Sequence, residues 1–221
     1  LSKKERREVL RLCQKNSITT TVHVPIFGIN INCVNPGIKG ESLRQVKQAI
    51  ALAADIKSRI VVLHSGPKPS SVPEVKEYTF QLLKNSLLEL KDFSTGKGMT
   101  LALENGVEEC WEESLEDFIR ILEETGLLCT LDTGHAHCSW GLEETVQKIA
   151  NKIIHIHISD NDGSWDQHLP VGKGKINFIN LLPFFKNYTG IICHEIQDRD
   201  NPEEATLKSR ANLERILRLE G

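Results

Sequence analysis

The chain has 221 residues, of which 39% are hydrophobic and 26% charged, and its formal net charge is −3. This composition is typical of a globular protein, and the bulk charge gives no support to nucleic-acid binding. No apolar run approaches the length of a membrane span, so no membrane partner is expected.

Helical and extended patterns alternate along the whole chain. In chain order, the patterns predict a helix over 2–16, a strand over 18–24, a loop over 26–39, a helix over 41–55, a strand over 59–63, a helix over 71–93, a strand over 99–103, a helix over 114–124, a strand over 127–131, a helix over 142–151, a strand over 153–158, a loop over 159–175, a helix over 176–186, a strand over 191–196 and a helix over 202–219.

The strands are short and apolar, and each is followed by a helix, which is typical of a parallel sheet covered by helices. Six such units predict an α/β protein with the (β/α)8 TIM-barrel fold, whose first two βα units are absent from this chain. An open doubly wound sheet is the alternative, but no G-x-G-x-x-G follows a strand. No linker interrupts the pattern, so residues 1–221 are expected to form a single, N-terminally incomplete domain.

The first residues and the cysteines bear on the compartment. LSKKERREVL has no apolar stretch of the kind found in a signal peptide, and it begins with Leu1 rather than Met. The six cysteines include no C-x-x-C pair, so free thiols and a cytoplasmic protein are expected. Cys129 and Cys193 lie in apolar strand patterns and are expected to be buried.

Each predicted strand ends in a residue type that binds metals. The segments are VHVP with His23, VVLHSG with His64, LALENG with Glu104, CTLDTGH with Asp132 and His135, IIHIHISD with His157, and IICHEI with Glu195. A buried strand has little use for these side chains unless they meet a cation or a hydrogen-bond partner. Because the carboxyl ends of barrel strands point to one place, the sequence predicts a divalent-metal site there.

The loop DGSWDQHLPVGKGKI brings a second acid and histidine, Asp166 and His168, back towards this end of the barrel. Asp160 is expected to orient His157 or a loop amide. His155 is interpreted as a hydrogen-bonded core histidine lower in the barrel. A solvated loop is favoured over a phosphate-binding role for the glycines and lysines of residues 172–175.

Together these motifs resemble the xylose isomerase-like TIM-barrel superfamily, which contains sugar isomerases and epimerases and the endonuclease IV family. HISDNDG and DQHLPVGKGKINF are similar to segments of its sugar phosphate isomerase/epimerase group. The resemblance implies one metal held by Glu104, Asp132, His157 and Glu195, with the two glutamates also moving protons on and off adjacent sugar carbons. Zn or Mn suits such ligands best, with Co, Fe and Mg as alternatives.

The chain also resembles endonuclease IV, which has a site of three zinc ions. The matching positions are His23, His64, Glu104, Asp132, His135, His157, Asp166, His168 and Glu195. This chain departs from endonuclease IV at two places. It has Gly134 where that family has the Cys of D-T-C-H, and it has Ser-Asp-Asn-Asp at residues 159–162 where that family has a strand end of the N-D-A-K type.

The first functional hypothesis is therefore a metal-dependent isomerase or epimerase acting on a sugar, a sugar phosphate or a related polyol by carboxylate-mediated proton transfer. In it, His135 and His168 bind substrate oxygens. The alternative is a zinc-dependent phosphodiesterase that cuts DNA at abasic sites. A binding module on a degenerate barrel is a third hypothesis, and the filled ligand set argues against it. Homodimers are common among such enzymes, and a homodimer is possible here.

Overall fold

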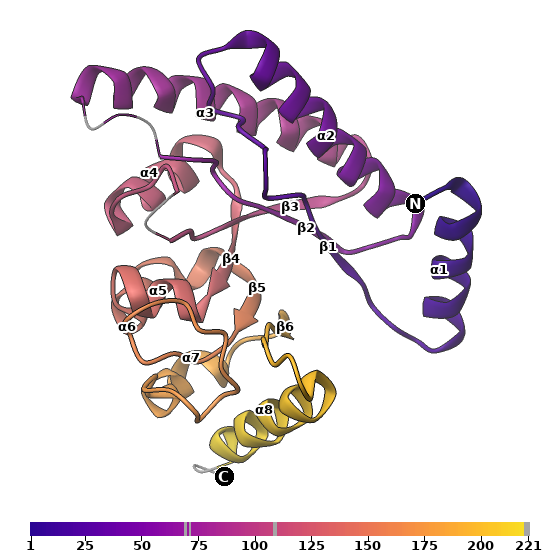
Figure 1. The fold of residues 1–221 in the computed structure, drawn as a ribbon, viewed down its shortest axis with the longest axis vertical. Coiled ribbons are helices and arrows are strands. Elements are labelled where there is room, and N and C mark those ends of the chain that lie inside the picture. The colour runs from indigo at the N-terminus through magenta and orange to yellow at the C-terminus, as the bar shows by residue number, and fades with distance from the viewer. Residues whose placement is uncertain (69, 71, 108–109, 219–221) are drawn as a thin grey trace.

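The computed structural model describes all residues of the chain except 69, 71, 108–109 and 219–221. In this part of the chain, parallel strands form one sheet in the order of the sequence (Figure 1). They are β1 (Thr21–His23), β2 (Ile60–Leu63), β3 (Thr100–Glu104), β4 (Leu128–Asp132), β5 (Ile153–Ile158) and β6 (Ile191–His194). Every predicted strand is present, and the arrangement is a partial (β/α) barrel.

One helix precedes β1, and further helices follow the strands and lie outside the sheet (Figure 1). They are α1 (Lys3–Lys15), α2 (Pro36–Asp55), α3 (Pro73–Thr95), α4 (Leu115–Thr125), α5 (Thr133–Ser139), α6 (Leu142–Ile149), α7 (Leu182–Phe185) and α8 (Pro202–Leu217), with 3-10 turns η1 (Ala150–Lys152) and η2 (Phe178–Leu181). None of the described helices is long and apolar enough to cross a membrane.

Strand β2 shows how the sheet separates two layers. Val61 and Leu63 join the large core between the sheet and the helices, whereas Ile60 and Val62 pack with Ala102 on the inner face. Side chains alternate between the faces of a strand, so this period of two fixes which residues point into the barrel. The same alternation brings the strand-end residues together at the carboxyl edge of the sheet.

Two helices differ from the sequence prediction at their starts. Helix α2 begins at Pro36 rather than 41, because the side chain of Asn35 accepts hydrogen bonds from the backbone N–H groups of Gly37 and Ile38. Residues 133–139, which lie outside the predicted helices, form α5, because the Asp132 side chain caps its amino end. Ser71, at the predicted start of the third helix, lies outside the described residues.

The predicted helix over 176–186 is wrong in its length. Only residues 178–185 are helical, and they divide into η2 and α7, with Pro183 in the first turn of α7. Proline lacks the N–H that a helix interior needs, so it is tolerated at a first turn and divides the segment there.

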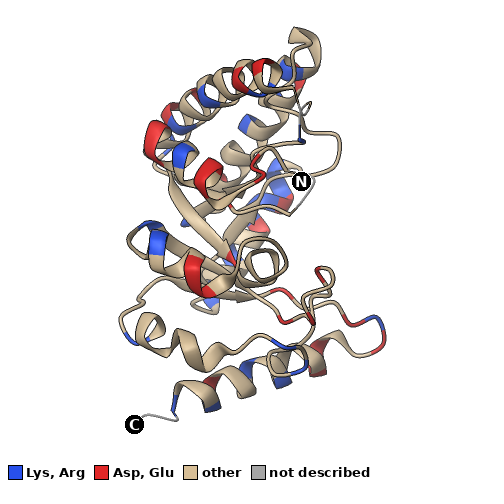
Figure 2. Ribbon diagram, turned by 90° about the vertical axis from the view of Figure 1, so that its left-hand side faces the viewer, with Lys and Arg blue, Asp and Glu red and all other residues tan. Residues whose placement is uncertain are grey.

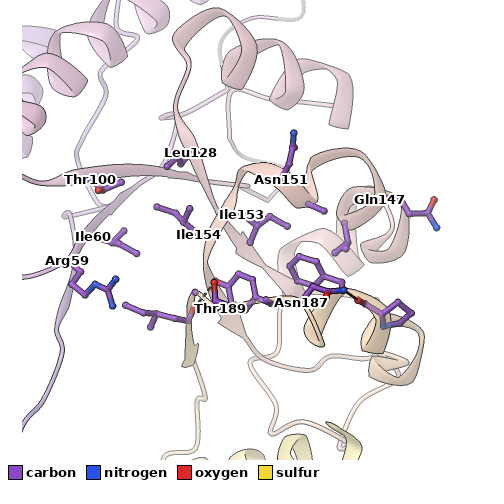
Figure 3. A pocket seen from close by; sticks show the side chains of 17 residues that line it. Arg59, Ile60, Thr100, Leu128, Gln147, Asn151, Ile153, Ile154, Asn187 and Thr189 are labelled. Atoms are coloured by element: carbon purple, nitrogen blue, oxygen red, sulfur yellow. Dashed lines mark hydrogen bonds between the residues drawn. The ribbon is translucent and has the colours of Figure 1, made fainter. Parts of the chain in front are cut away.

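The amino ends of the strands surround a cavity of about 830 Å³, shown in Figure 3 with Arg59, Thr100 and Asn151 on its wall. None of the predicted ligands lines it. A second cavity, of about 800 Å³, lies at the carboxyl ends, and six of the candidate ligands line it: His23, His64, Glu104, His135, His168 and Glu195. Barrel enzymes work at that end. In Figure 2, Lys and Arg are interspersed with Asp and Glu along the helices, so that view shows no continuous basic face.

Candidate metal centre

Glu104, at the end of β3, lies at the centre of the candidate site. Its Oε2 atom is 3.0 Å from Nε2 of His23, the last residue of β1, and 3.3 Å from Nε2 of His64, the residue after β2. Its Oε1 atom is 2.8 Å from Nδ1 of His157 on β5. The two carboxylate oxygens thus face imidazoles on opposite sides, and the side chain is only 2% exposed.

Glu195 reaches the same imidazole from β6. Its Oε2 atom is 3.0 Å from Nδ1 of His157, the nitrogen that also contacts Glu104. Unlike Glu104, the Glu195 side chain is 42% exposed. The pair therefore consists of one buried and one accessible carboxylate around a single nitrogen atom.

Asp132 completes this group from the end of β4. Its Oδ1 atom accepts a hydrogen bond from the backbone N–H of His135, 2.7 Å away. Its Oδ2 atom is buried without a hydrogen-bond partner in the described part of the chain. The Asn105 side chain exchanges two hydrogen bonds with the Asp132 backbone and so fixes the end of β4. A bare carboxylate oxygen beside two other carboxylates calls for a cation.

A further group forms where α5 meets the loop after β5. Oδ2 of Asp166 is 3.2 Å from Nε2 of His135 and 2.6 Å from Nε2 of His168. The second Asp166 oxygen is buried without a partner among the described residues. The loop after β5 therefore brings Asp166 and His168 to the candidate site, as the sequence predicts.

Three of the histidines are held in the same way. Their Nδ1 atoms lie against backbone carbonyl oxygens, which can only accept, so each Nδ1 carries a proton and each Nε2 is the nitrogen that faces a carboxylate of the cluster. The pairs are His23 with Val24 at 2.7 Å, His135 with Asn105 at 2.9 Å, and His168 with Glu195 at 2.9 Å. Metal-binding histidines are typically oriented by such a bond.

The ionisation of the cluster follows from burial and from these contacts. Burial opposes charge on Glu104, yet the imidazoles of His64, His157 and His23 hold its pKa well below the ordinary value. Burial also opposes charge on His157, yet Glu104 and Glu195 raise its pKa to about 11. In the metal-free protein, the proton on the His157 imidazole therefore balances the carboxylates, in the place where a cation would act.

The predicted ligands assemble into three groups in which one ligand atom from each residue lies within 4.8 Å of the others. The groups are His23, His64 and Glu104; His135, Asp166 and His168; and Glu104, Asp132, His157 and Glu195. Nitrogen and carboxylate donors of this kind fit a divalent transition metal. The structure thus brings together all nine residues that the sequence singled out, and Glu104 belongs to two groups.

Asp160 supports the loop that carries Asp166 and His168. Its carboxylate accepts hydrogen bonds from the backbone N–H groups of Gly172, Gly174 and Ile176 at 2.9 to 3.1 Å. It therefore orients loop amides rather than His157. Because these amides are already used, the glycines of residues 172–175 have no N–H groups there for a phosphate.

Two expectations about the strands were wrong. His155 is fully buried, but neither ring nitrogen has a hydrogen-bond partner among the described residues. A bulge in the pairing of β4 with β5 sets it opposite Thr130, whose hydroxyl also lacks a partner. Cys193 is exposed rather than buried, and it lies on β6, which is at the end of the sheet in the described part of the chain. Cys129, on a central strand, is buried as expected.

Sequence reasoning missed two residues that shape the site. Asn105 holds Asp132 and His135, and its position directly after Glu104 in LALENG was a signal that could have drawn attention to it. Glu112 is a buried carboxyl group between two loops, and nothing in its local sequence distinguishes it from the acids around it.

Parallel strands with a cluster of histidines and carboxylates at their carboxyl ends define an α/β-barrel protein with a candidate metal centre. The chain belongs to the xylose isomerase-like TIM barrel family, which it matches over residues 1–216.

Three similar proteins bear on this assignment. Uncharacterized protein MJ1311 of Methanocaldococcus jannaschii is 31% identical over 209 residues, which are 88% of this chain and 70% of that protein. The crystal structure of a D-tagatose 3-epimerase-like protein superposes with a TM-score of 0.89 at 27% identity, covering 98% of this chain and 83% of the other. The IOLI protein, solved with a binding zinc atom, has the same fold, with a TM-score of 0.81 at 19% identity and coverage of 96% and 81%.

Proposed function

We propose that this protein is a divalent-metal-dependent isomerase or epimerase acting on a sugar or a related polyhydroxy compound. The observation that carries the proposal is the meeting of Glu104 and Glu195 at Nδ1 of His157, beside the bare Oδ2 atom of Asp132. The metal, for which Zn and Mn are the first candidates, would supply positive charge where negative charge develops on substrate oxygens.

The two glutamates would move the proton. Glu195 is accessible from the cavity and can take a proton from the carbon next to a carbonyl group. Glu104 lines the same cavity and can return a proton to the substrate. General acid–base catalysis needs groups held within hydrogen-bond reach of the substrate, and the contacts of both carboxylates with His157 fix their positions.

The cavity suits a small, neutral, hydroxyl-rich substrate. His135 and His168 line it, and the Nε2 atoms that they direct at Asp166 are the donors that a substrate oxygen would share. Among the described residues that line it there is no Lys or Arg. The likeness to a D-tagatose 3-epimerase-like protein supports the same substrate class, and the zinc in the IOLI protein supports a metal in this fold.

The test combines metal analysis with solvent exchange. Purified protein is analysed for bound metals, reloaded with Mn²⁺, Co²⁺ or Zn²⁺, and incubated with a panel of ketoses in D₂O. We expect deuterium to enter the substrate at the carbon beside the carbonyl, together with a new epimer, and Glu195→Gln to abolish both. Absence of exchange with every metal and ketose would contradict the proposal.

A second function is favoured by one specific observation. The three ligand groups share Glu104 or adjoin it, and together they could hold three cations rather than one. Such clusters suit phosphodiester hydrolysis, in which several cations stabilise both the attacking and the leaving oxygen. The alternative is therefore zinc-dependent cleavage of DNA at abasic sites.

Metal stoichiometry and one substrate distinguish the two functions. Three zinc ions per chain and cleavage of an abasic-site duplex would favour the hydrolase. One ion per chain, held by the group that contains Asp132, and deuterium exchange into a ketose would favour the isomerase.

A further inference from the structure

A buried carboxyl group outside the candidate ligands, Glu112, joins two of the loops that carry them. The residue is 1% exposed. Its Oε1 atom accepts a hydrogen bond from the backbone N–H of Gly106, 2.8 Å away, and its Oε2 atom accepts one from the hydroxyl of Ser65. Ser65 directly follows His64, and Gly106 lies two residues after Glu104.

The backbone around Glu112 ties the same two loops together. The N–H of Trp111 donates to the carbonyl of Gly66 at 2.9 Å, and Pro67 and Cys110 form an antiparallel bridge. The Trp111 side chain is buried, and its indole N–H donates to Thr79 on α3. The described residues of the loops after β2 and β3, 65–67 and 110–112, are thus held together beside His64 and Glu104.

Burying a carboxyl group at this position costs free energy that an apolar residue filling the same space would not cost. Burial raises the pKa of Glu112 to about 7, which shows how strongly its surroundings disfavour the charge. An apolar side chain of similar volume would avoid this cost. It would not provide two acceptors aimed at two different loops.

The ligands that these loops carry lie close together. Nε2 of His64 is 3.3 Å from Oε2 of Glu104, and both atoms belong to the group that includes His23. Metal ligands must be held within fractions of an ångström of their working positions. Neighbouring residues that orient them commonly change metal affinity by about 10- to 100-fold when they are removed.

We propose that Glu112 is a positioning residue of the candidate metal centre, which fixes His64 relative to Glu104 by joining Ser65 to Gly106. This inference rests on the proposed function, because it takes the group of His23, His64 and Glu104 to bind a metal.

Four variants separate this role from simple packing. Glu112→Leu keeps the volume and removes both acceptors. Glu112→Gln keeps hydrogen bonds to both loops, because the amide oxygen can accept from the N–H of Gly106 while the amide nitrogen donates to the hydroxyl of Ser65. Ser65→Ala removes one end of the join. Glu113→Gln is the matched control, since Glu113 is the next residue and pairs with Lys68 and Lys76 at the surface.

The probe is Co²⁺, whose visible absorption reports ligand geometry. We expect Glu112→Leu to weaken Co²⁺ binding by about 10- to 100-fold and to change the spectrum. Ser65→Ala should weaken Co²⁺ binding less. Adding Ser65→Ala to Glu112→Leu should weaken Co²⁺ binding little beyond Glu112→Leu alone. Glu112→Gln and Glu113→Gln should match the wild type. Wild-type affinity and spectrum in Glu112→Leu would overturn the proposal.

A metal-free measurement distinguishes failure of this inference from failure of the proposed function. If wild-type protein binds no Co²⁺, the metal-dependent function is wrong, and the positioning role is then read from imidazole NMR signals. Glu112→Leu must shift the ring signals of His64 and leave those of His168 in place. Unchanged His64 signals overturn the role. If Glu112→Leu does not fold, the same comparison is made with Ser65→Ala.

Discussion

Oε1 of Glu104 lies 2.8 Å from Nδ1 of His157, although the two residues are 53 positions apart in the chain. The contact joins β3 to β5 across β4. Since the other oxygen of Glu104 faces His23 and His64, one carboxylate connects the imidazoles of three strands. Glu104 is thus the residue that two of the three ligand groups share.

Replacing Glu104 should therefore affect metal binding more than replacing any other ligand. We expect Glu104→Gln to lower the affinity for Zn²⁺ by more than about 100-fold, which exceeds the usual effect of residues that only orient ligands. The measurement is calorimetric titration of metal-free protein. Glu113→Gln, which removes a carboxylate at the surface, should bind Zn²⁺ as the wild type does. Equal affinities in the two variants would contradict the central role of Glu104.

Gly134→Ala should separate the ligand groups. A Cβ atom at Gly134 would lie 2.6 Å from Oδ1 of Asp166 and 2.7 Å from the hydroxyl of Ser159, so the Asp166 carboxylate must move. Both obstacles are side-chain ends, and alanine favours the helix by up to about 1 kcal/mol, so folding should be preserved.

We expect Gly134→Ala to lose any cation bound by His135, Asp166 and His168 while retaining the one beside Asp132. Elemental analysis and thermal unfolding measure both effects. Gly40→Ala is the matched control, because Gly40 is also helical and has nothing within 4 Å of the added atom. An unchanged metal content together with unchanged activity would show that the group around Asp166 holds no cation.

Removing bound metal should lower the melting temperature. A ligand at 100 times its dissociation constant stabilises the folded state by about 2.7 kcal/mol. For a chain of this size that corresponds to a shift of roughly 5 to 10 °C. The comparison is thermal unfolding with a chelator and with Zn²⁺. Glu104→Gln should show little difference between the two conditions, and a wild-type protein that melts at the same temperature in both would argue against a structural contribution of the metal.

Glu112 should make stability depend on pH. Its pKa in the folded protein is about 7 against an ordinary value of 4.5, so the folded state binds more protons than the unfolded state between these pH values. The free energy of unfolding should then fall as pH rises through this window, by about 3 kcal/mol in total.

The measurement is chemical denaturation of the wild type and of Glu112→Gln between pH 4.5 and 8. The difference in unfolding free energy between them should grow in favour of the Gln variant as pH rises, because that variant has no charge to bury. Glu113→Gln should keep the slope of the wild type. Parallel curves for the wild type and Glu112→Gln would contradict the raised pKa.

The sequence alone predicted the parallel sheet and singled out the nine candidate ligands, which the structure brings to one edge of that sheet. Short apolar strands alternating with helices require a parallel sheet, and parallel strands bring their carboxyl ends to one edge. A charged or imidazole residue at each of those ends, as at Glu104 and Glu195, is therefore recognisable without coordinates.

Only the tertiary structure decided how those residues divide into groups. Which oxygen of Glu104 faces which imidazole, and which histidine nitrogen is held by a carbonyl, depend on side-chain directions that no local pattern specifies. The packing of Gly134 against Asp166 and the hydrogen bond between Glu112 and Ser65 arise from contacts between loops far apart in the chain. Local propensity acts over a few residues, whereas these contacts exist only after the strands have come together.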